Sequence, residues 1–378
     1  MEVNTGADGG VRNDAAKPAS SAARDVRGAG KRERPLRIVA ALGWVAVGAA
    51  AGGMAFAACW PARLDETGTV WVAVSWVAFM IETFAMHAGV AIAAVVGFAL
   101  LTRRWRMALA ALLLSLWCGW GVIGTLAGQG LRAATAGAEI EEPAALRVLL
   151  MNVMYSRADV DRVMAVIERE RPDVLLIQEW TGAAETRYGA RLRAMFPHAM
   201  AWAQDDAFGQ ASFSTLQMRD ERAYLSPRIM NPQQSFVVEH AGAAVRVVNV
   251  HLLPPVSIGY FRLQRSETAA LAEFARERLG EGERLVLAGD FNATWASAHG
   301  RALRDAGLDS AHEVAGVGLG GTWPMNAGPL ARLGAIGLDQ VLVGGGLGVR
   351  SMRVLENIGS DHAPVLAELT VRTVSRSK

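Results

Sequence analysis

Two short motifs near the C-terminus combine residue types that could act on a phosphate ester. Residues 287–292 read Leu-Ala-Gly-Asp-Phe-Asn at the end of an apolar segment, and residues 359–362 read Gly-Ser-Asp-His just before another. Side chains in a strand alternate with period 2, so Asp290 and Asn292 point to the same side. The second motif sets a carboxylate beside the titratable imidazole of His362. Together the motifs indicate metal-assisted attack of water on a phosphate ester.

Polar residues of the same kinds recur where other apolar segments of the C-terminal region end. A single residue of this kind at a strand end is commonly a cap or a turn residue. A whole series suggests instead that the strand ends converge on one site, provided that the strands belong to one sandwich. The series consists of Asn152, Glu179, His251, Asp290, Asn292, Asp339, Asp361 and His362.

The segments that would position these residues alternate between strand and helix patterns from residue 144 to residue 378. Leu146–Val153 and Val174–Ile177 are short apolar runs typical of buried strands, and Asp159–Arg169 between them has helical apolar spacing. Phe261–Leu279 predicts a long amphipathic helix that ends at a glycine. This alternation predicts an α+β domain in which two mixed sheets pack face to face with helices outside.

The N-terminal third of the chain has a different composition. The sequence is 52% hydrophobic, with a mean hydropathy of +0.21. The excess comes from three uncharged stretches, Ile38–Ala62, Thr83–Thr102 and Met107–Leu131. Each is long enough to cross a bilayer as a helix, which takes ~20 apolar residues. We therefore predict a membrane region with three transmembrane helices over residues 37–132. A cleaved signal peptide fits poorly, because the first stretch begins late and two more follow.

Charge around these stretches predicts their orientation. Lysine and arginine cluster before the first stretch, and Arg103, Arg104 and Arg106 lie between the second and the third, whereas the other flanks carry few basic residues. Positive charge marks the cytoplasmic side of a membrane. The N-terminus is thus expected inside and the C-terminal domain outside. This predicts a multi-pass protein of the bacterial inner membrane with a periplasmic domain.

Three segments outside the spans have simpler interpretations. Residues 1–36 lack apolar periodicity and are predicted to form a disordered cytoplasmic tail, and residues 133–143 are predicted to be a linker. Val70–Ile81 is either a helix lying on the membrane surface or the start of a tilted second span. Glu82 and His87 are interpreted as interfacial residues at a helix end rather than as a functional pair within the membrane.

Cysteine usage excludes some classes of site. The two cysteines, Cys59 and Cys118, both fall in the predicted spans. The C-terminal domain therefore has no disulfide, and at its length it needs none to fold. The sequence contains no CxxC or HExxH motif, so a zinc site with the usual ligand spacing is not indicated.

The motif order from about residue 146 to residue 370 resembles the endonuclease/exonuclease/phosphatase superfamily, which includes DNase I, abasic-site nucleases and neutral sphingomyelinases. The resemblance implies a DNase I-like fold, a four-layer α/β/β/α sandwich, over residues 144–378. The Gly-Thr-Trp-Pro segment at 321–324 is similar to the corresponding segment of a bacterial subgroup of this superfamily, whose members carry N-terminal membrane helices. The resemblance is carried by Leu-Leu-Met-Asn-Val at Asn152, Ile-Gln-Glu-Trp at Glu179, Asn-Val-His-Leu at His251, Gly-Asp-Phe-Asn at Asp290 and Asn292, Gly-Leu-Asp-Gln-Val at Asp339, and Ser-Asp-His-Ala-Pro-Val at Asp361 and His362.

The resemblance also implies a divalent metal and its ligands. Glu179 would hold Mg²⁺, with Mn²⁺ as an alternative, and Asn152 and Asp361 would lie close to the coordination shell. Magnesium prefers oxygen ligands and keeps several waters, so one or two carboxylates suffice. The metal would polarise the phosphoryl oxygen and neutralise developing charge.

The remaining motif residues are expected to move protons and to hold the phosphate. His362 would be the general base or would donate to the phosphoryl oxygen, and Asp339 would orient it. Asp290 would align or deprotonate the water, with Asn292 fixing that carboxylate and the phosphate. His251 would donate to a non-bridging oxygen or to the leaving group. The sequence leaves open whether Asp290 or His362 is the base.

Three functional hypotheses remain. The first is a membrane-anchored, Mg²⁺-dependent phosphoesterase outside the cytoplasm, with nucleic acid as one substrate class. From Pro143 onward acidic and basic residues are equal in number, whereas a duplex-binding nuclease usually has a basic surface. A membrane tether would place the site near lipid head groups, so the second hypothesis is a sphingomyelinase-like phospholipid phosphodiesterase. The third is a catalytically silent membrane scaffold, which the complete set of motif residues disfavours. The expected partners are the lipid bilayer and a phosphate-ester substrate, and no protein partner is indicated.

Overall fold

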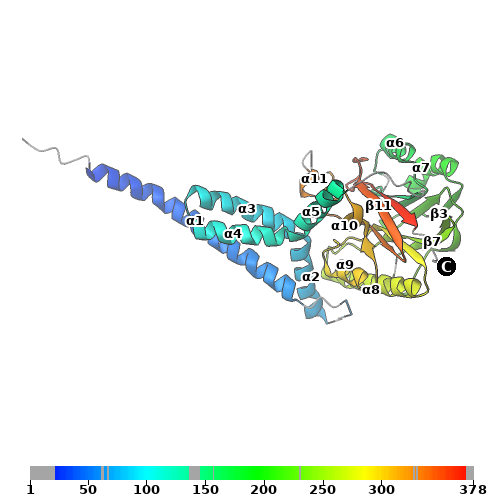
Figure 1. Cartoon of the computed structure of the whole chain (residues 1–378), viewed down its shortest axis with the longest axis horizontal. Helices are drawn as coiled ribbons and strands as arrows, with labels where there is room; N and C mark the ends of the chain where they lie inside the picture. The colour runs from blue at the N-terminus through cyan, green and yellow to red at the C-terminus, as the bar shows by residue number, and fades with distance from the viewer. Residues whose placement is uncertain are drawn as a thin grey trace, which may run out of the picture.

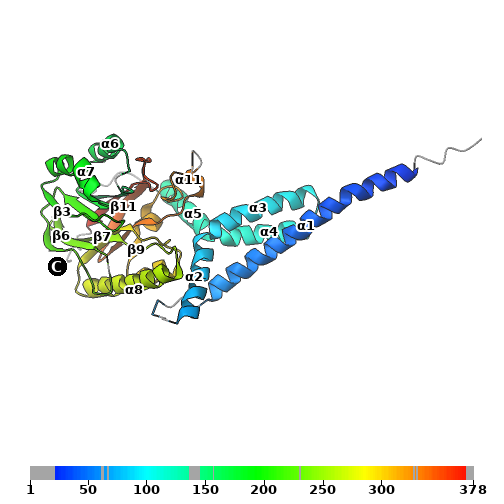
Figure 2. The same cartoon turned by 180° about the vertical axis from the view of Figure 1, so that it is seen from behind.

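The chain forms an elongated helical region and a C-terminal domain of strands and helices (Figure 1). The computed structural model describes residues 22–371 except 61–63, 66–67, 136–144, 156, 230, 327 and 329–330. Figure 2 shows from behind that the helical region projects from one side of the C-terminal domain.

Helices α1, α3 and α4 pack against one another in the projecting bundle (Figure 1). Its buried core contains Val47, Ile92, Ala111 and Leu114. Helices α2 and α5 lie at the junction with the C-terminal domain. The helices of this region are α1 (Ala22–Cys59), α2 (Thr69–Thr83), α3 (Ala85–Leu101), α4 (Trp105–Cys118) and α5 (Trp120–Thr135).

The helical region differs from the three unbroken spans that the sequence predicts. One helix, Arg34–Cys59, is long and apolar enough to cross a membrane. The second and third candidates are pairs of helices, bent by 59° between α2 and α3 and by 64° between α4 and α5. The described residues thus contain one clear candidate span, or up to 3 if each bent pair forms one span.

Each break has a local cause. Helix α2 packs one face on the C-terminal domain, where Val72 and Phe79 contact Phe261, and α3 turns away from it into the bundle. The second break falls at Gly119, a residue type with low helix propensity. Val70–Ile81 therefore lies against the C-terminal domain, an arrangement that hydropathy alone does not predict.

Two predicted segments are described only in part. Residues 22–36 continue α1 toward the N-terminus. Residues 1–21 lie outside the described residues. The predicted linker 133–143 begins inside α5, and its remainder also lies outside the described residues.

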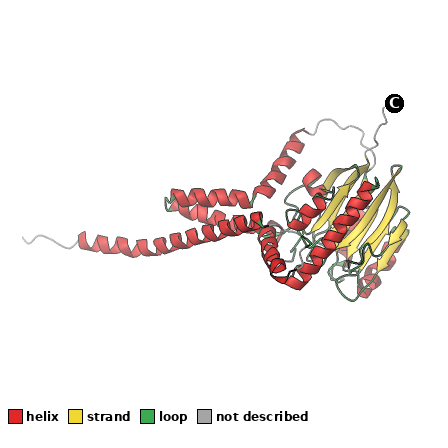
Figure 3. Cartoon of the chain, turned by 90° about the horizontal axis from the view of Figure 1, so that it is seen from below, coloured by secondary structure: helices red, strands yellow, loops and turns green. Residues whose placement is uncertain are grey.

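The C-terminal domain contains two 6-stranded mixed sheets. The first has the order β11-β12-β1-β2-β4-β3, with β1 parallel to β2, and the second has the order β5-β6-β7-β8-β10-β9, with β7 parallel to β8. Figure 3 shows the strands grouped beyond the helical projection. The strands are β1 (Leu146–Asn152), β2 (Val174–Gln178), β3 (His198–Trp202), β4 (Gln210–Ser214), β5 (Arg219–Arg222), β6 (Gln234–His240), β7 (Ala243–His251), β8 (Arg284–Asp290), β9 (Asp309–Ser310), β10 (Asp339–Gly344), β11 (Leu347–Val354) and β12 (Val365–Val371).

The two sheets pack face to face, and helices cover their outer faces. Val148 and Leu150 of β1 pack with Val247 of β7 in the core between the sheets. The alternate residues Leu149 and Met151 pack under α6 and α7, and α8 and α9 close the opposite side. The expected α/β/β/α layering is therefore present. The helices of this domain are α6 (Val160–Glu170), α7 (Gly182–Met195), α8 (Ile258–Gly280), α9 (Ala298–Arg304), α10 (Ala311–Ala315) and α11 (Ala331–Gly334).

Polar contacts join the helical region to the C-terminal domain. The carboxylate of Glu82 accepts a hydrogen bond from the guanidinium of Arg301 at 2.9 Å. Nε2 of His87 lies 2.6 Å from the carbonyl oxygen of Gly334. Glu82 and His87 thus connect two parts of the chain, a role that the interpretation as interfacial residues does not include.

Candidate active site

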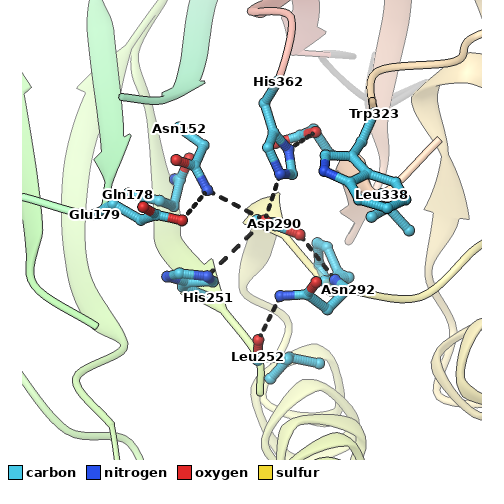
Figure 4. A network of polar contacts seen from close by, with 12 residues as sticks. Asn152, Gln178, Glu179, His251, Leu252, Asp290, Asn292, Trp323, Leu338 and His362 are labelled. Atoms are coloured by element: carbon cyan, nitrogen blue, oxygen red, sulfur yellow. Dashed lines mark hydrogen bonds and ion pairs between the residues drawn. The ribbon is translucent and has the colours of Figure 1, made fainter. Parts of the chain in front are cut away.

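The polar strand ends meet at one end of the sandwich. In the second sheet His251 ends β7, Asp290 ends β8 and Asp339 begins β10, and the register pairs Asp290 with both of the others. In the first sheet Asn152 ends β1, and Glu179 directly follows β2. Figure 4 shows the side chains of Asn152, Glu179 and His251 gathered around Asp290.

A glycine allows β7 and β8 to approach closely beside the site. Gly289 has a φ of +149°, and a Cβ atom there would lie 1.9 Å from the carbonyl oxygen of Val250. Any side chain at this position would push the two strands apart. The glycine that precedes Asp290 in its motif is therefore needed for the geometry of the site.

Asp290 is the centre of the network (Figure 4). Its Oδ2 atom lies 3.3 Å from Nδ2 of Asn152, 3.6 Å from Nε2 of His362 and 3.9 Å from Nε2 of His251. Its Oδ1 atom accepts a hydrogen bond from the backbone N–H of Asn292 at 2.9 Å. The side chain is buried. One oxygen is thus held by the backbone, and the other faces two imidazoles and an amide.

His362 is oriented by a buried carboxylate. Its Nδ1 atom lies 2.7 Å from Oδ2 of Asp339. The hydroxyl of Thr322 accepts hydrogen bonds from the backbone N–H groups of Leu338 and Asp339, each at 3.1 Å, and so fixes the start of β10. Burial by itself lowers the pKa of His362, but the charges of Asp339 and Asp290 outweigh burial and raise it to about 10. The imidazole is therefore positively charged at neutral pH.

His251 has a different electrostatic environment. Burial lowers its pKa, and the charge of Asp290 opposes that effect only in part. Gln233 holds the backbone of His251 from both sides, accepting from its N–H and donating to its carbonyl oxygen, each at 2.9 Å. The ring of Phe208 lies 5.4 Å from the imidazole. His251 is therefore a rigidly placed neutral imidazole.

Glu179 presents a carboxylate oxygen that no described residue uses. Its Oε1 atom accepts a hydrogen bond from Nδ2 of Asn152 at 3.0 Å. Its Oε2 atom is buried and has no hydrogen-bond partner among the described residues. Burial raises the pKa of Glu179 to about 7. A buried carboxylate with a free oxygen is suited to a cation, which would stabilise its charged form.

Two groups of donor atoms could hold a metal ion. Asp290, Asp339 and His362 offer ligand atoms within 4.8 Å of one another, but the bond between Asp339 and His362 already uses two of these groups. Glu179 offers its free oxygen beside the amide of Asn152. Magnesium prefers oxygen donors. The residues around Glu179 therefore fit this ion better than the group that contains the imidazole.

Asp361 and Asn292 lie at the site with contacts that the sequence does not predict. Oδ2 of Asp361 lies 3.3 Å from the indole nitrogen of Trp323, and the charge of Asp361 contributes to the raised pKa of Glu179. Nδ2 of Asn292 donates to the carbonyl oxygen of Leu252 at 2.8 Å. The amide of Asn292 thus holds a neighbouring loop, while its backbone holds Asp290.

Two positioning residues lie outside the series of site residues that the sequence predicts. Gln233 lies in no motif, so no local signal identifies it. Thr322 belongs to the Gly-Thr-Trp-Pro segment. The similarity of this segment to that of a bacterial subgroup was the signal that could have identified Thr322. Asn249 lies two residues before His251 in β7, but its amide lies in a buried network with Gln178 and Ser212 between the sheets.

The family model for the endonuclease/exonuclease/phosphatase family matches residues 149–362. The chain belongs to this family. Family members hydrolyse phosphate esters and typically depend on a divalent metal. The match includes every site residue described above, from Asn152 to His362.

Several solved structures are similar to part of this chain. An endonuclease/exonuclease/phosphatase from Beutenbergia cavernae is 18% identical, with 60% of this chain and 72% of that chain covered and a TM-score of 0.48. An endonuclease/exonuclease/phosphatase from Bacteroides vulgatus is 18% identical. The match covers 61% of this chain and 100% of that chain, with a TM-score of 0.48. The 3′ phosphatase NExo from Neisseria, bound to a product DNA hairpin, is 22% identical. The match covers 59% of this chain and 99% of that chain, with a TM-score of 0.48. No curated protein matches the sequence.

Proposed function

We propose that the protein is a membrane-anchored, Mg²⁺-dependent phosphoesterase whose C-terminal domain acts outside the cytoplasm. The observation that carries this proposal is the position of Asp290, whose Oδ2 atom lies 3.6 Å and 3.9 Å from the imidazoles of His362 and His251. The free oxygen of Glu179 provides a place for the metal at the same end of the sandwich. These groups can activate water, bind a phosphate and receive a proton.

Asp290 is the proposed general base. Its Oδ1 atom is held by the backbone of Asn292, which leaves Oδ2 to receive the proton of the attacking water. The water oxygen forms a bond to phosphorus as the bond to the leaving oxygen breaks. Metal held by Glu179, with Asn152 and Asp361 nearby, would polarise a phosphoryl oxygen and offset its growing charge.

The two histidines are proposed to bind phosphoryl oxygens as hydrogen-bond donors. Nδ1 of His362 is engaged by Asp339, so Nε2 is the atom that faces the reaction site. A charged imidazole donates a strong hydrogen bond to an anionic oxygen, and its raised pKa makes it a poor base. His251, which is neutral, would donate to a second phosphate oxygen or to the leaving group.

Membrane anchoring is supported by the outer surface of α1. Leu42 is 62% exposed and Val45 is 67% exposed. A row of such side chains is unfavourable in water and favourable in lipid. The basic residues that precede the apolar stretch of α1, Arg34 and Arg37 among them, are expected to stay in the cytoplasm. The C-terminal domain would then lie on the outer side, in the periplasm of a bacterium with two membranes.

The substrate class is tested by offering several phosphate esters to the full chain in detergent. The substrates are bis(p-nitrophenyl) phosphate, supercoiled plasmid and phospholipid micelles, each with Mg²⁺ and with EDTA. Hydrolysis that requires the metal supports the proposal, and the substrate cleaved identifies the class. A folded chain that cleaves none of them would contradict the proposal and favour the catalytically silent scaffold.

A further inference from the structure

Exposed apolar side chains are unevenly distributed over the C-terminal domain. At the end of the sandwich away from the site, the described turns at 171–173, 241–242 and 281–283 contain no large exposed apolar side chain. The site end has many. We call the following residues the mouth rim: Tyr155, Trp202, Tyr224, Val256, Ile258 and Tyr260.

Four residues of the mouth rim lie in the segments that directly follow the catalytic strands β1 and β7. Tyr155 lies three residues beyond the end of β1, and burial together with the charge of Glu179 raises the pKa of its phenol. Val256, Ile258 and Tyr260 lie between the end of β7 and the first turn of α8. Val256 is 72% exposed, and the other three are 37–45% exposed. These side chains therefore flank the site and face solvent.

Of the other two rim residues, Trp202 ends β3 and Tyr224 lies two residues after the end of β5. Trp202 and Tyr224 contact each other edge to face, with ring centroids 6.0 Å apart. The residue before Tyr224 accepts a hydrogen bond from the backbone of Gln233, which in turn holds His251. Both aromatic rings are nearly half exposed. The mouth rim thus contains several exposed aromatic side chains.

The rim continues onto the helical region. The indole of Trp76 on α2 donates to the carbonyl oxygen of Pro255 at 2.8 Å, so α2 lies directly beside the rim loop. On the same helix Val70 is 73% exposed and Trp71 is 52% exposed. Exposed apolar side chains are therefore present both on α2 and on the rim loop that α2 contacts.

We propose that the mouth rim rests in the head-group layer of the bilayer and that the site acts on phosphate esters of phospholipid head groups. The inference depends on the proposed function, because it takes the bundle as the membrane anchor. Tyrosine and tryptophan are enriched where lipid meets water, since their rings have an apolar body and a polar tip. The mouth rim contacts α2, and α2 leads into the bundle. We therefore take the membrane that holds the bundle to be the surface that covers the rim.

The position of the rim is tested directly by fluorescence. The full chain, with Cys59 and Cys118 changed to Ala, is reconstituted in vesicles of phosphatidylcholine and phosphatidylglycerol. A bimane label is placed on Ile258→Cys or, as the reference, on Glu281→Cys in a turn at the far end. Lipids carrying a nitroxide should quench most of the fluorescence at 258 and little at 281. Equal quenching at the two positions would overturn the proposal.

The role of the rim in substrate access is tested with a serine variant at Val256, Ile258 and Tyr260. The reference variant changes Val314 of α10 and Val317, which lies just after α10, to serine; both side chains are exposed. In reconstituted full-length protein the rim variant should cleave soluble bis(p-nitrophenyl) phosphate normally and lose about tenfold of its phospholipid hydrolysis, because apolar contacts with lipid are removed. If the rim variant lost the same activity on both substrates, or lost none on either, the proposed role of the rim in substrate access would be contradicted.

The wild-type results separate this inference from the proposed function. A wild type that cleaves bis(p-nitrophenyl) phosphate but no phospholipid overturns the substrate inference and leaves the phosphoesterase in place. A wild type that cleaves neither overturns the proposed function, while the quenching experiment still decides whether the rim lies at the membrane.

Discussion

The imidazole of His362 and the carboxylate of Asp339 lie 2.7 Å apart, although 23 residues separate them in the chain. The bond joins the start of β10 to the loop that precedes β12. It fixes the ring so that Nε2 faces Asp290 at 3.6 Å.

Changing Asp339→Asn should lower both the activity and the pKa of His362. The substitution keeps the shape of the side chain and removes the charge that holds the imidazole protonated. We expect kcat to fall by roughly 10²- to 10³-fold, the range for loss of one preorganised donor to a charged oxygen. An NMR titration of the His362 ring should show its pKa moving down from about 10. An unchanged His362 titration in the folded variant would rule out the proposed control by Asp339.

Changing Glu179→Gln should weaken metal binding before it affects folding. The substitution removes the charge of the carboxylate and replaces its free oxygen. We expect the affinity for Mg²⁺ and Mn²⁺ to fall by at least about tenfold. Calorimetric titration of the full chain in detergent measures this directly. Glu168→Gln, a change of the same type at an exposed position of α6, serves as the control, and equal affinities in the two variants would contradict the assignment.

The stability of the domain should depend on Glu170, which is remote from the proposed metal ligands. Its buried carboxylate accepts hydrogen bonds from Arg169 and Arg353, each at 2.9 Å. Burial alone would raise the pKa of Glu170, but these arginines outweigh it and hold the pKa below 4.5. Because the folded-state pKa is lowered, this contribution is present at neutral pH and is lost as the pH falls through that value.

Glu170→Gln should therefore destabilise the chain by about 1–3 kcal/mol at pH 7, because hydrogen bonds between charged groups are lost. The partial exposure of the arginines limits the size of this loss. The difference in thermal midpoint between wild type and variant should shrink as the pH is lowered below 4.5. A difference that is constant across this pH range would show that the charge of Glu170 is not responsible.

The membrane orientation can be examined with reporter fusions. Alkaline phosphatase fused after Val371 should be active, because the enzyme folds in the periplasm, and green fluorescent protein fused there should be dark. The control places both reporters before α1, where the opposite result is expected. A silent phosphatase with a bright fluorescent protein at the C-terminal position would reverse the proposed orientation.

The strand and helix order of the catalytic core could be predicted because burial leaves a strong pattern in the sequence. Leu146–Val153, Asp159–Arg169 and Phe261–Leu279 correspond to β1, α6 and α8 within a few residues. Strands β3 and β11 were missed because most of their residues are only partly buried, so apolar alternation is weak. Strand β4 was also missed although it is fully buried, because apart from Phe213 its residues are polar or small. Apolar periodicity thus identifies those buried elements whose side chains are themselves apolar.

The site residues that end buried strands could be predicted from the sequence. Residues that reach the site only through long-range contacts could not. His251 and Asp290 occupy paired positions at neighbouring strand ends, as the motifs suggest. Gln233 comes from a separate loop, and nothing in the local sequence indicates its contact with His251. The docking of α2 on α8 was missed for the same reason, since hydropathy does not distinguish a helix buried by lipid from one buried by protein.

The most direct test of the central claim compares Asp290→Asn with Asp309→Asn in the full chain. Both variants remove one carboxylate charge, but Asp309 is exposed on β9, away from the network. The rate of Mg²⁺-dependent hydrolysis of bis(p-nitrophenyl) phosphate is measured alongside the thermal midpoint. The account predicts that Asp290→Asn loses roughly 10²- to 10⁴-fold in kcat with its fold intact, while Asp309→Asn retains the wild-type rate. A wild-type rate in folded Asp290→Asn would contradict the account.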